Sequence, residues 1–325
     1  MTPFRGSARP GTLTPRRYVR IGGQGPEDVV ADDRGRVLTG VADGRVLRID
    51  GLTLPGSPRV EELARTGGRP LGLALHPDGS LLVCDAERGL LAVDPEHGTV
   101  RVLADSAAGE PLRFCSNATV LSDGTVCFTV SSRRHPLEHW IGELVEHTGT
   151  GRLLRLAPDD KEPEVVVDGL RFAGGVAASA DESFLVVAET GARRLTRVRL
   201  TGPAAGRHDV LADDLPGAPD NISRTPGGPL WVALAGPRVP GLDLLHRRGP
   251  GVRRAAARAA LRVPYRPTGY AGVLAVDDHG RTVHHLERRH GGFRMVTAVC
   301  ETGGRLVLGS MWEAGVAVCE PPATG

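Results

Sequence analysis

The stretch "PLGLALHPDGSLLVCDAERGLLAVD" (residues 70–94) contains three short apolar runs separated by two tight-turn sequences. The first turn carries Pro-Asp-Gly and the second carries Glu-Arg-Gly, and such residues favour reversals of the chain between β-strands. The runs are short and rich in Leu and Val, which is typical of buried strands rather than helices. The stretch therefore predicts consecutive β-strands joined by tight turns.

Five further stretches repeat this pattern, starting at residues 28, 117, 175, 221 and 296. The first turns of the six units fall 44, 45, 59, 45 and 76 residues apart, near Gly35, Gly79, Gly124, Ser183, Gly228 and Gly304. A period near 45 residues with about four short strands per unit is the pattern of propeller blades. The sequence therefore predicts an all-β fold, a six-bladed β-propeller.

The sixth unit has only three predicted strands, whereas Pro15 to Ile21 form an extra strand-like run ahead of the first unit. If that run pairs with the last unit, it completes the sixth blade and removes a free sheet edge. We therefore expect a single propeller over residues 14–325, closed by its N-terminal strand and preceded by a disordered segment, residues 1–13.

The two long separations locate insertions of about 14 and about 31 residues, near residues 133–150 and 237–271. In the first, Pro136 is placed to begin a helix, and an apolar stripe follows on Trp140, Ile141, Leu144 and Val145. The second contains "RRAAARAALR", an arginine-rich helix candidate. Both fall between the second and third strands of their units, so we expect helical lid insertions on the top face.

The composition argues against several classes of partner. The formal net charge of +2 and the scattered arginines do not indicate a nucleic-acid surface. The first 15 residues lack the apolar core of a secretory signal, and no window is long enough to span a membrane. We therefore expect a cytoplasmic protein with no nucleic-acid and no membrane partner. The five cysteines show no metal-ligand spacing, which favours buried thiols.

Polar residues stand at the heads of the predicted innermost strands, which converge on the propeller axis. Counting back seven or eight positions from each first turn leads to Glu27, Leu71, Asn117, Gly174, Asp220 with Asn221, and Thr297. The ends of the second strands add Asp43, Asp85, Glu189 and Glu313. Such a ring of carboxylates and amides is suited to binding a cation or to acid/base chemistry.

These motifs resemble the strictosidine synthase-like family, above all in residues 151–222, which contain "GGVAASAD" and "PDN". The resemblance covers about residues 20–235 and resumes at 293–318. That family belongs to a superfamily of six-bladed propellers that also includes senescence marker protein 30, gluconolactonases and paraoxonases. The resemblance thus implies the same fold as the repeat does.

The lactonase-type members of that superfamily hold a divalent metal, and their ligand positions correspond here to Glu27, Asn117, Gly174 and Asp220. Glycine brings no ligand atom, and Ala118 and Val130 stand where the family often has Asp. We therefore expect no cofactor. The alternative is a lactonase or esterase of the gluconolactonase type, with Ca²⁺ or Zn²⁺ held by Glu27, Asn117 and Asp220.

The sequence "GGVAASAD" also resembles the plant strictosidine synthases, which condense an aryl-ethylamine with an aldehyde without a metal. Their catalytic glutamate corresponds here to Thr297, so another carboxylate has to accept and return protons. We expect Glu27 in this role, and after it Glu313, because burial raises the pKa of a carboxyl group.

The leading hypothesis is a metal-independent condensation or cyclisation of Pictet–Spengler type, acting on a small aromatic amine in secondary metabolism. A non-catalytic propeller that binds a small ligand is a further alternative to the hydrolase. The candidate substrate-binding residues, in which aromatic side chains would wall a flat molecule, are Asn117, Gly174, Glu189, Asp220, Asn221, Trp140, Tyr270, Thr297 and Trp312.

Overall fold

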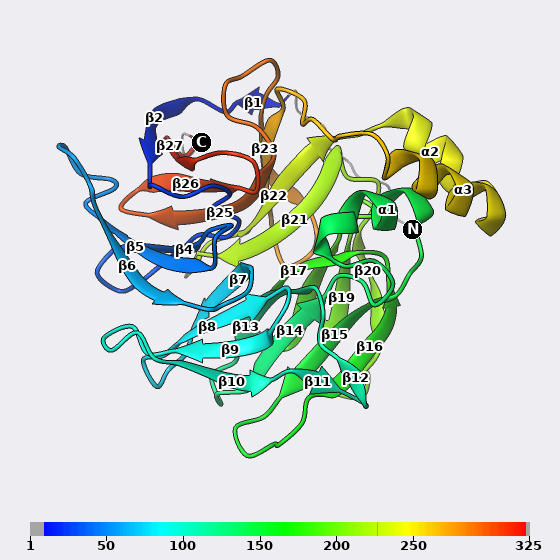
Figure 1. Ribbon diagram of the computed structural model, residues 1–325, viewed down its shortest axis with the longest axis horizontal. Coiled ribbons are helices and arrows are strands. Elements are labelled where there is room, and N and C mark those ends of the chain that lie inside the picture. Colours follow the sequence, from blue (N-terminus) through cyan, green and yellow to red (C-terminus); the bar gives the residue numbers. More distant parts are fainter. Residues whose placement is uncertain (1–9, 226, 323–325) are drawn as a thin grey trace.

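The computed structural model describes residues 10–225 and 227–322. Six antiparallel sheets follow one another around a central axis, in chain order (Figure 1). The first three blades are β3 to β6 (Val30–Ala31, Val37–Gly40, Arg45–Asp50, Arg59–Arg65), β7 to β10 (Pro70–Leu75, Leu81–Asp85, Gly89–Val93, Val100–Ala104) and β13 to β16 (Cys115–Val120, Val126–Val130, Gly151–Leu156, Glu164–Leu170). The small hairpin of β11 (Ser106–Ala107) and β12 (Glu110–Pro111) joins the second blade to the third.

The other three blades follow the same plan. They are β17 to β20 (Ala173–Ala178, Phe184–Glu189, Arg194–Arg199, His208–Ala212), β21 to β24 (Gly217–Arg224, Leu230–Pro237, Ala271–Val276, Thr282–Arg288) and β25 to β27 (Val296–Thr302, Arg305–Ser310, Gly315–Cys319) with β2 (Pro15–Arg20). The all-β, six-bladed propeller expected from the turn spacing is confirmed.

The N-terminal strand closes the ring as expected. β2 pairs antiparallel with β27, with Tyr18 opposite Ala317, and so becomes the outer strand of the sixth blade. Part of the segment expected to be disordered is ordered as well: β1 (Gly11–Thr12) pairs in parallel with β24, and Leu13 is fully buried in an apolar cluster with Trp231 and Phe293. Burial of that leucine explains the order. Residues 1–9 of the segment lie outside the described residues.

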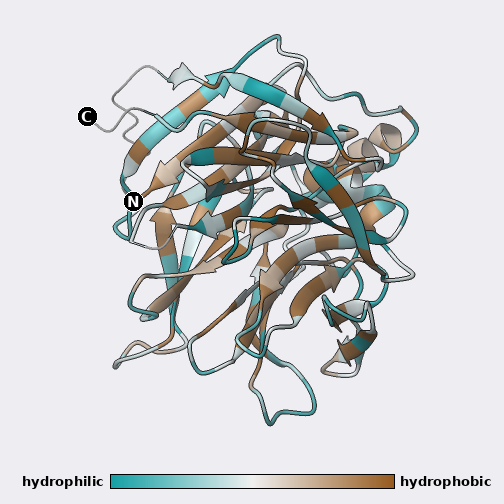
Figure 2. Ribbon diagram, turned by 90° about the vertical axis from the view of Figure 1, so that its left-hand side faces the viewer, coloured by the Kyte–Doolittle hydropathy of each residue, from teal (hydrophilic) through white to brown (hydrophobic). Residues whose placement is uncertain are grey.

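The core lies between neighbouring blades. The second strand of each blade is almost entirely apolar and buried, as in β8 and β18, because both of its faces pack against other sheets. In outer strands such as β10 and β20, most residues are exposed or half-buried. Figure 2 shows brown, apolar strands towards the inside and teal residues mostly at the periphery. The propeller is thus a rigid frame that fixes the residues at its axis.

Both insertions emerge on the same face and meet there, so the predicted lid is confirmed (Figure 1). The first contains a 3₁₀ turn (Leu137–His139) and α1 (Trp140–Glu146), and the second contains α2 (Pro240–His246) and α3 (Pro250–Ala260). Pro136 lies at the N-cap of the 3₁₀ turn rather than inside a helix. None of the described helices is both long and apolar enough to cross a membrane.

Candidate active site

A β-bulge near the head of the innermost strand recurs in five blades. The register shifts lie between Pro70 and Leu73, Cys115 and Ala118, Ala173 and Val176, Pro219 and Ile222, and Val296 and Ala298. A bulge breaks the regular alternation of side chains along a strand and re-aims one of them. For this reason, the side chains of consecutive residues at these positions point towards different ends of the axial channel.

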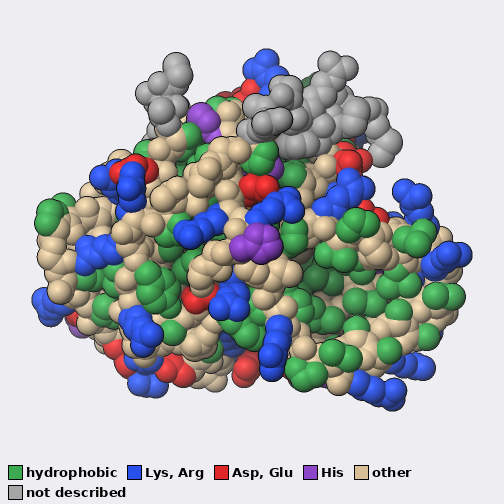
Figure 3. Space-filling view, turned by 90° about the horizontal axis from the view of Figure 1, so that it is seen from above, with side chains coloured by type: hydrophobic (Ala, Val, Ile, Leu, Met, Phe, Trp, Pro, Cys, Tyr) green, Lys and Arg blue, Asp and Glu red, His purple; other side chains and the backbone are tan. Residues whose placement is uncertain are grey.

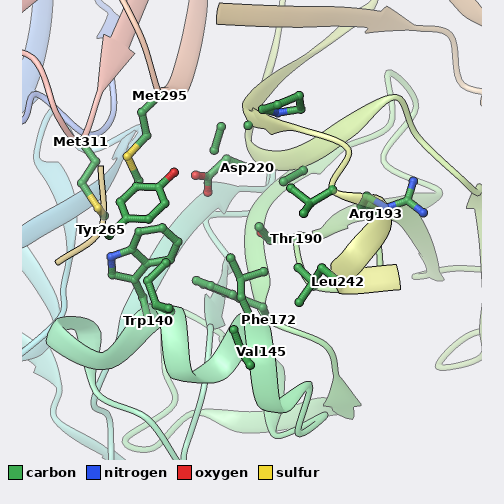
Figure 4. Close-up of a pocket in the computed structure, with 18 of the residues that line it drawn as sticks. Trp140, Val145, Phe172, Thr190, Arg193, Asp220, Leu242, Tyr265, Met295 and Met311 are labelled. Atoms are coloured by element: carbon green, nitrogen blue, oxygen red, sulfur yellow. The ribbon is translucent and has the colours of Figure 1, made fainter. Parts of the chain in front are cut away.

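The lid and the ring enclose a cavity of about 250 Å³ at the top of the axis. Its wall is mostly apolar: Phe114 and Phe172 come from the ring, Trp140 from α1, Tyr265 from the second insertion, and Met295 and Met311 from the sixth blade. Figure 4 shows Asp220 pointing into this space, with Tyr265, Met295 and Met311 on one side of it and Phe172 and Leu242 on the other. The cavity fits an apolar small molecule.

The lid over this cavity is a single packed unit built from both insertions. The rings of Trp140 and Tyr265 meet edge to face with centroids 4.8 Å apart. The rings of His147 and His246 lie 3.9 Å apart, and Arg253 donates a hydrogen bond to the carbonyl oxygen of His147 at 3.1 Å. Burial beside several arginines lowers the pKa of His147 to about 3, so this ring is neutral at physiological pH.

Two carboxylates, Glu27 and Asp220, form the polar floor of the cavity. The side-chain amide of Asn221 donates to both carboxylate oxygens of Glu27, at 3.1 and 3.2 Å, and Thr297 donates to its backbone carbonyl at 2.6 Å. Burial, and then the charges of Asp220 and Asp28, raise the pKa of Glu27 well above its usual range. Burial and the charge of Asp28 raise the pKa of Asp220 to about 8. Asp220 therefore holds its proton up to near-neutral pH.

Asp28 lies directly after Glu27 but faces the other end of the channel, where an open funnel of about 510 Å³ begins. Its carboxylate accepts the backbone N–H groups of Val29 and Leu73, each at 2.8 Å, and the amide of Asn117 at 3.0 Å. Burial nevertheless raises the pKa of Asp28 to about 6. Arg69 is the buried cation that opposes these charges, and its guanidinium donates to backbone carbonyls of Pro70 and Gly25.

Asn117 does not join Glu27 and Asp220. Its amide nitrogen is bound to Asp28, and its amide oxygen accepts the backbone N–H of Val176 at 3.0 Å. Asn117 borders the lower funnel rather than the upper cavity. The expectation that it contacts a substrate or a metal in the upper cavity is therefore corrected: the bulge in β13 aims this side chain into the next layer, where it ties the third blade to the first and fourth.

The two adjacent glycines, Gly174 and Gly175, lack a side chain for different physical reasons. A Cβ atom on Gly175 would lie 2.3 Å from the backbone nitrogen of Ile222, so any side chain would push β17 away from β21. A Cβ atom on Gly174 would instead meet Thr190 Oγ1 at 3.1 Å and Asp220 Oδ1 at 3.2 Å. Gly175 is required for packing, whereas Gly174 leaves space beside the carboxylate of Asp220.

Two oxygen atoms near the floor have no hydrogen-bond partner among residues 10–225 and 227–322: Asn221 Oδ1 and Thr190 Oγ1. Together with the carboxylates of Glu27 and Asp220 they offer only oxygen ligands, which suit Ca²⁺ better than Zn²⁺. The described residues contain no group of three or more His, Cys, Asp or Glu that could hold a metal. A cation here would thus depend on two carboxylates, neutral oxygens and water, and these residues fit calcium in that way.

Besides Asn117, four further expected site residues lie outside the upper cavity. Glu189 is fully buried, where it accepts the backbone N–H of Arg171 at 2.8 Å and pairs with Arg194 at 2.7 Å. Glu313 faces Arg294, at 3.3 Å, and does not line the cavity. Burial raises its pKa, so its proton affinity is perturbed as expected, but it is not placed to reach a molecule bound there.

Tyr270 is buried in the apolar cluster between the fourth and fifth blades, and Trp312 is 39% exposed on the surface. Both were expected to wall the substrate, and both predictions are corrected. Their places are taken by Tyr265, which lies five residues earlier in the chain, and Met311, which directly precedes Trp312. Which residue reaches the cavity wall depends on the direction of its side chain at a bulge or loop end, and not on its position in the chain alone.

Of the expected residues, Glu27, Asp220 and Trp140 line the cavity, with Gly174 next to Asp220 and with Asn221 and Thr297 holding Glu27 in place. Sequence reasoning missed Asp28 and Thr190, although each is adjacent to a residue that it selected. It also missed Met295, Phe114 and Phe172, which all have positive φ angles of 53° to 59° and stand just before an innermost strand. A bulky residue at such a strained position is a signal that only the backbone reveals.

Comparison with known proteins agrees with this fold. The profile of the family described as strictosidine synthase matches residues 117–203, and that of the strictosidine synthase-like N-terminal region matches residues 16–49. The protein strictosidine synthase-like 13 of Arabidopsis thaliana is 35% identical over 298 residues, which are 82% of this chain and 73% of that protein. The adipocyte plasma membrane-associated protein of Rattus norvegicus is 35% identical over 314 residues, covering 88% of this chain and 80% of the relative.

Among solved structures, a gluconolactonase of Xanthomonas campestris superposes with a TM-score of 0.66 at 18% identity, covering 99% of this chain and 97% of the other. The calcium-binding protein regucalcin of Agrobacterium tumefaciens superposes with a TM-score of 0.63 at 14% identity, covering 96% and 95% of the two chains. At such identities these structures establish the fold alone. The sequence matches to the Arabidopsis and rat proteins, at 35% identity over more than four fifths of this chain, carry the assignment further, and the chain belongs to the strictosidine synthase-like family.

Proposed function

We propose that this protein is a hydrolase of carboxylic esters or lactones, acting on an apolar, ring-containing small molecule. One observation carries the proposal: Glu27 and Asp220 stand together on the floor of a mostly apolar, lidded cavity, and neither forms an ion pair with any residue that the structure describes. Apolar walls exclude water from the substrate while the carboxylates remain as the reactive groups. We place this activity in the cytoplasm, in keeping with the sequence expectation.

Ester hydrolysis needs a base that takes a proton from the attacking water and an acid that returns a proton to the departing alkoxide. Asp220 points into the cavity, and without a bound cation its pKa is raised to about 8, so that it can take a proton and return it near neutral pH. A bound cation would lower this pKa, and Asp220 would then start the reaction as the base. Glu27 is more deeply buried, and Asn221 and Thr297 fix its position. The charges of Asp220 and Asp28 add to the effect of burial in raising the pKa of Glu27.

A divalent cation fits the same floor, where Glu27, Asp220 and the unpartnered Asn221 Oδ1 would hold it. When bound, calcium would polarise the carbonyl group of the ester and stabilise the negative charge that develops on its oxygen. Thr190 Oγ1 lies beside Gly174 and Asp220 and is free to bind water or the substrate's oxygen.

The experiment is a hydrolysis screen with aryl esters and with aromatic and alkyl lactones, on protein first treated with a chelator and then supplied with calcium. We expect activity in the calcium-loaded protein and a loss of at least about 100-fold in kcat/KM for Glu27→Gln and Asp220→Asn. Asp159→Asn, in an exposed turn, is the matched control and should retain full activity. Hydrolysis that survives both floor substitutions would refute the proposal.

A second candidate is the condensation of an aromatic amine with an aldehyde, and a specific observation favours it. The cavity joins an aromatic wall of Trp140, Tyr265 and Phe172 to an acidic floor, which also complements an aryl-alkylammonium ion. Against it, Thr297 is fully buried, donates to the carbonyl of Glu27 and does not reach the cavity. The position that carries the catalytic glutamate in the synthases is therefore not available here.

Chelated protein incubated with pairs of aromatic amines and aldehydes separates the two candidates. A cyclised product that is formed without calcium and lost on Glu27→Gln would support condensation. The absence of any cyclised product over the panel, with calcium-dependent hydrolysis of esters or lactones, would support the hydrolase. Calorimetry with calcium alone gives an independent readout, because a cation bound by Glu27 and Asp220 should stabilise the fold and fail to do so in the variants.

A further inference from the structure

The second insertion carries a strong local charge that the net charge of the chain conceals. Residues 238–266 contain eight arginines and a single acidic residue, Asp243. Arg238 pairs with Asp243 and Asp214, and Arg254 pairs with Glu146. Within the described residues, five others are exposed and make no ion pair: Arg247, Arg248, Arg258, Arg262 and Arg266. The lid is therefore a concentrated positive surface on a nearly neutral protein.

The same segment is rich in exposed apolar side chains. Of the large apolar residues that are exposed in the described chain, six lie between residues 239 and 265: Val239 (52%), Leu244 (56%), Val252 (55%), Leu261 (37%), Val263 (69%) and Tyr265 (39%). The other eight are spread over five of the six blades, with no more than two in any one blade. We call these six residues and the five unpaired arginines the lid surface. Exposed apolar groups gathered in one place mark interaction sites.

The two kinds of side chain are mixed along α3. Its inward face holds the buried Ala257 and the half-buried Arg253, which bind it to α1. Val252 and Arg258 of α3 are exposed, Arg254 reaches Glu146 of α1, and Arg262 is exposed in the turn that follows the helix. Seen from above, the side of the molecule towards α2 and α3 shows green apolar side chains bordered by blue basic ones (Figure 3).

We propose that the lid surface docks on an anionic lipid membrane. Arginines attract acidic headgroups, and exposed Leu, Val and Tyr side chains enter the boundary between headgroups and acyl chains. This combination favours lipid over nucleic acid, because leucine and valine gain nothing from a phosphate backbone. The sequence expectation of no membrane partner rested on the lack of a membrane-spanning run, and docking through an exposed surface does not need such a run.

The lid surface also borders the cavity. Val239, Tyr265 and Arg266 belong to it and line the cavity wall at the same time. A protein that lies on a membrane through this surface therefore has its cavity close to the lipid. Apolar molecules dissolved in that lipid are then concentrated at the entrance. The docking itself does not depend on which reaction the cavity performs.

The test is co-sedimentation of the full chain with vesicles of phosphatidylcholine alone or with phosphatidylserine added to about one third. We expect binding to the anionic vesicles only, weakened as salt rises from about 0.05 to about 0.3 M. Replacing Arg247, Arg248, Arg258 and Arg262 by Gln should lower the partition coefficient at least about 50-fold. Leu244→Ser with Val263→Ser should lower it about tenfold without changing the salt dependence.

The matched control replaces four exposed arginines of the blades, which also make no ion pair within the described residues, by Gln: Arg34, Arg59, Arg101 and Arg207. It removes the same charge and should bind vesicles almost as the parent protein does. Equal losses in the control and the lid variant would overturn the proposal, since general charge would then explain the binding. Tighter binding to duplex DNA or RNA than to anionic vesicles would overturn it too.

Discussion

Replacing Asp220 by Asn should make the protein more stable at alkaline pH while it removes activity. In the unfolded chain this carboxyl group has a pKa near 3.8, and burial and the charge of Asp28 raise the pKa of Asp220 to about 8 in the folded protein. The folded state therefore binds this proton more tightly than the unfolded state does. The contribution of Asp220 to stability is greatest below about pH 4 and is lost as pH rises towards 8.

The magnitude follows from the two pKa values. If Asp220 titrates alone, the loss at pH 8 amounts to about 5 kcal/mol in the free energy of unfolding. The carboxylate keeps contact with water in the cavity and shares its field with Glu27, so we expect about half of this, roughly 2 to 3 kcal/mol. Asn has the same shape and no charge, so Asp220→Asn should regain that amount at pH 8 and almost nothing near pH 4.

Urea unfolding, followed by tryptophan fluorescence at pH 4.5, 6 and 8 in the presence of a chelator, measures the effect. The difference between the variant and the parent protein should grow steadily with pH. Asp159→Asn, at an exposed turn, should give the same difference at all three values. A constant difference for Asp220→Asn would refute the reasoning, because it would mean that Asp220 is already ionised at low cost in the fold.

Three further predictions concern packing and the lid. Glu189→Ala should destabilise the fold by about 3 kcal/mol, because the buried N–H of Arg171 and hydroxyl of Thr196 lose their acceptor and Arg194 loses its partner, yet folded protein should keep its KM; urea unfolding and steady-state kinetics check both. Gly175→Ala should cost about 3 kcal/mol, since its Cβ would meet the backbone of Ile222, whereas Gly174→Ala should cost under about 1 kcal/mol. Trp140→Ala should raise KM at least about tenfold with little change in kcat, because it removes part of the cavity wall.

The fold could be predicted from the sequence because its signal is local and repeated. Each blade can be recognised by a tight turn between two apolar runs, as at Gly79 and Gly124, and the spacing of these turns indicates a propeller. Both insertions were visible as departures from that spacing. The helix α2 was not predicted, because its seven residues, which begin with Pro240, are too few for a long apolar repeat.

The candidate site could be predicted only in part, because strand periodicity does not show where a bulge falls. Counting from the turns located Glu27 and Asp220 correctly at the axis. The same counting selected Asn117, but the bulge between Cys115 and Ala118 sends its amide to Asp28 instead. For Glu313 the failure lies at the other end of a strand, where the loop leads the side chain to Arg294. The direction of a side chain at a bulge or a loop end depends on the tertiary structure and cannot be counted from the sequence pattern.

The pairing of β2 with β27 sets an order of events during synthesis. Pro15–Arg20 leave the ribosome early, but their partner Gly315–Cys319 is made about 300 residues later. At the usual speed of translation this wait lasts between about 15 and 60 seconds. Five blades can stack during that time, while β2 stays without its partner until Gly315–Cys319 have been made. The ring therefore stays open until late in synthesis, and a chain that stops before Gly315 has nothing with which β2 can close it.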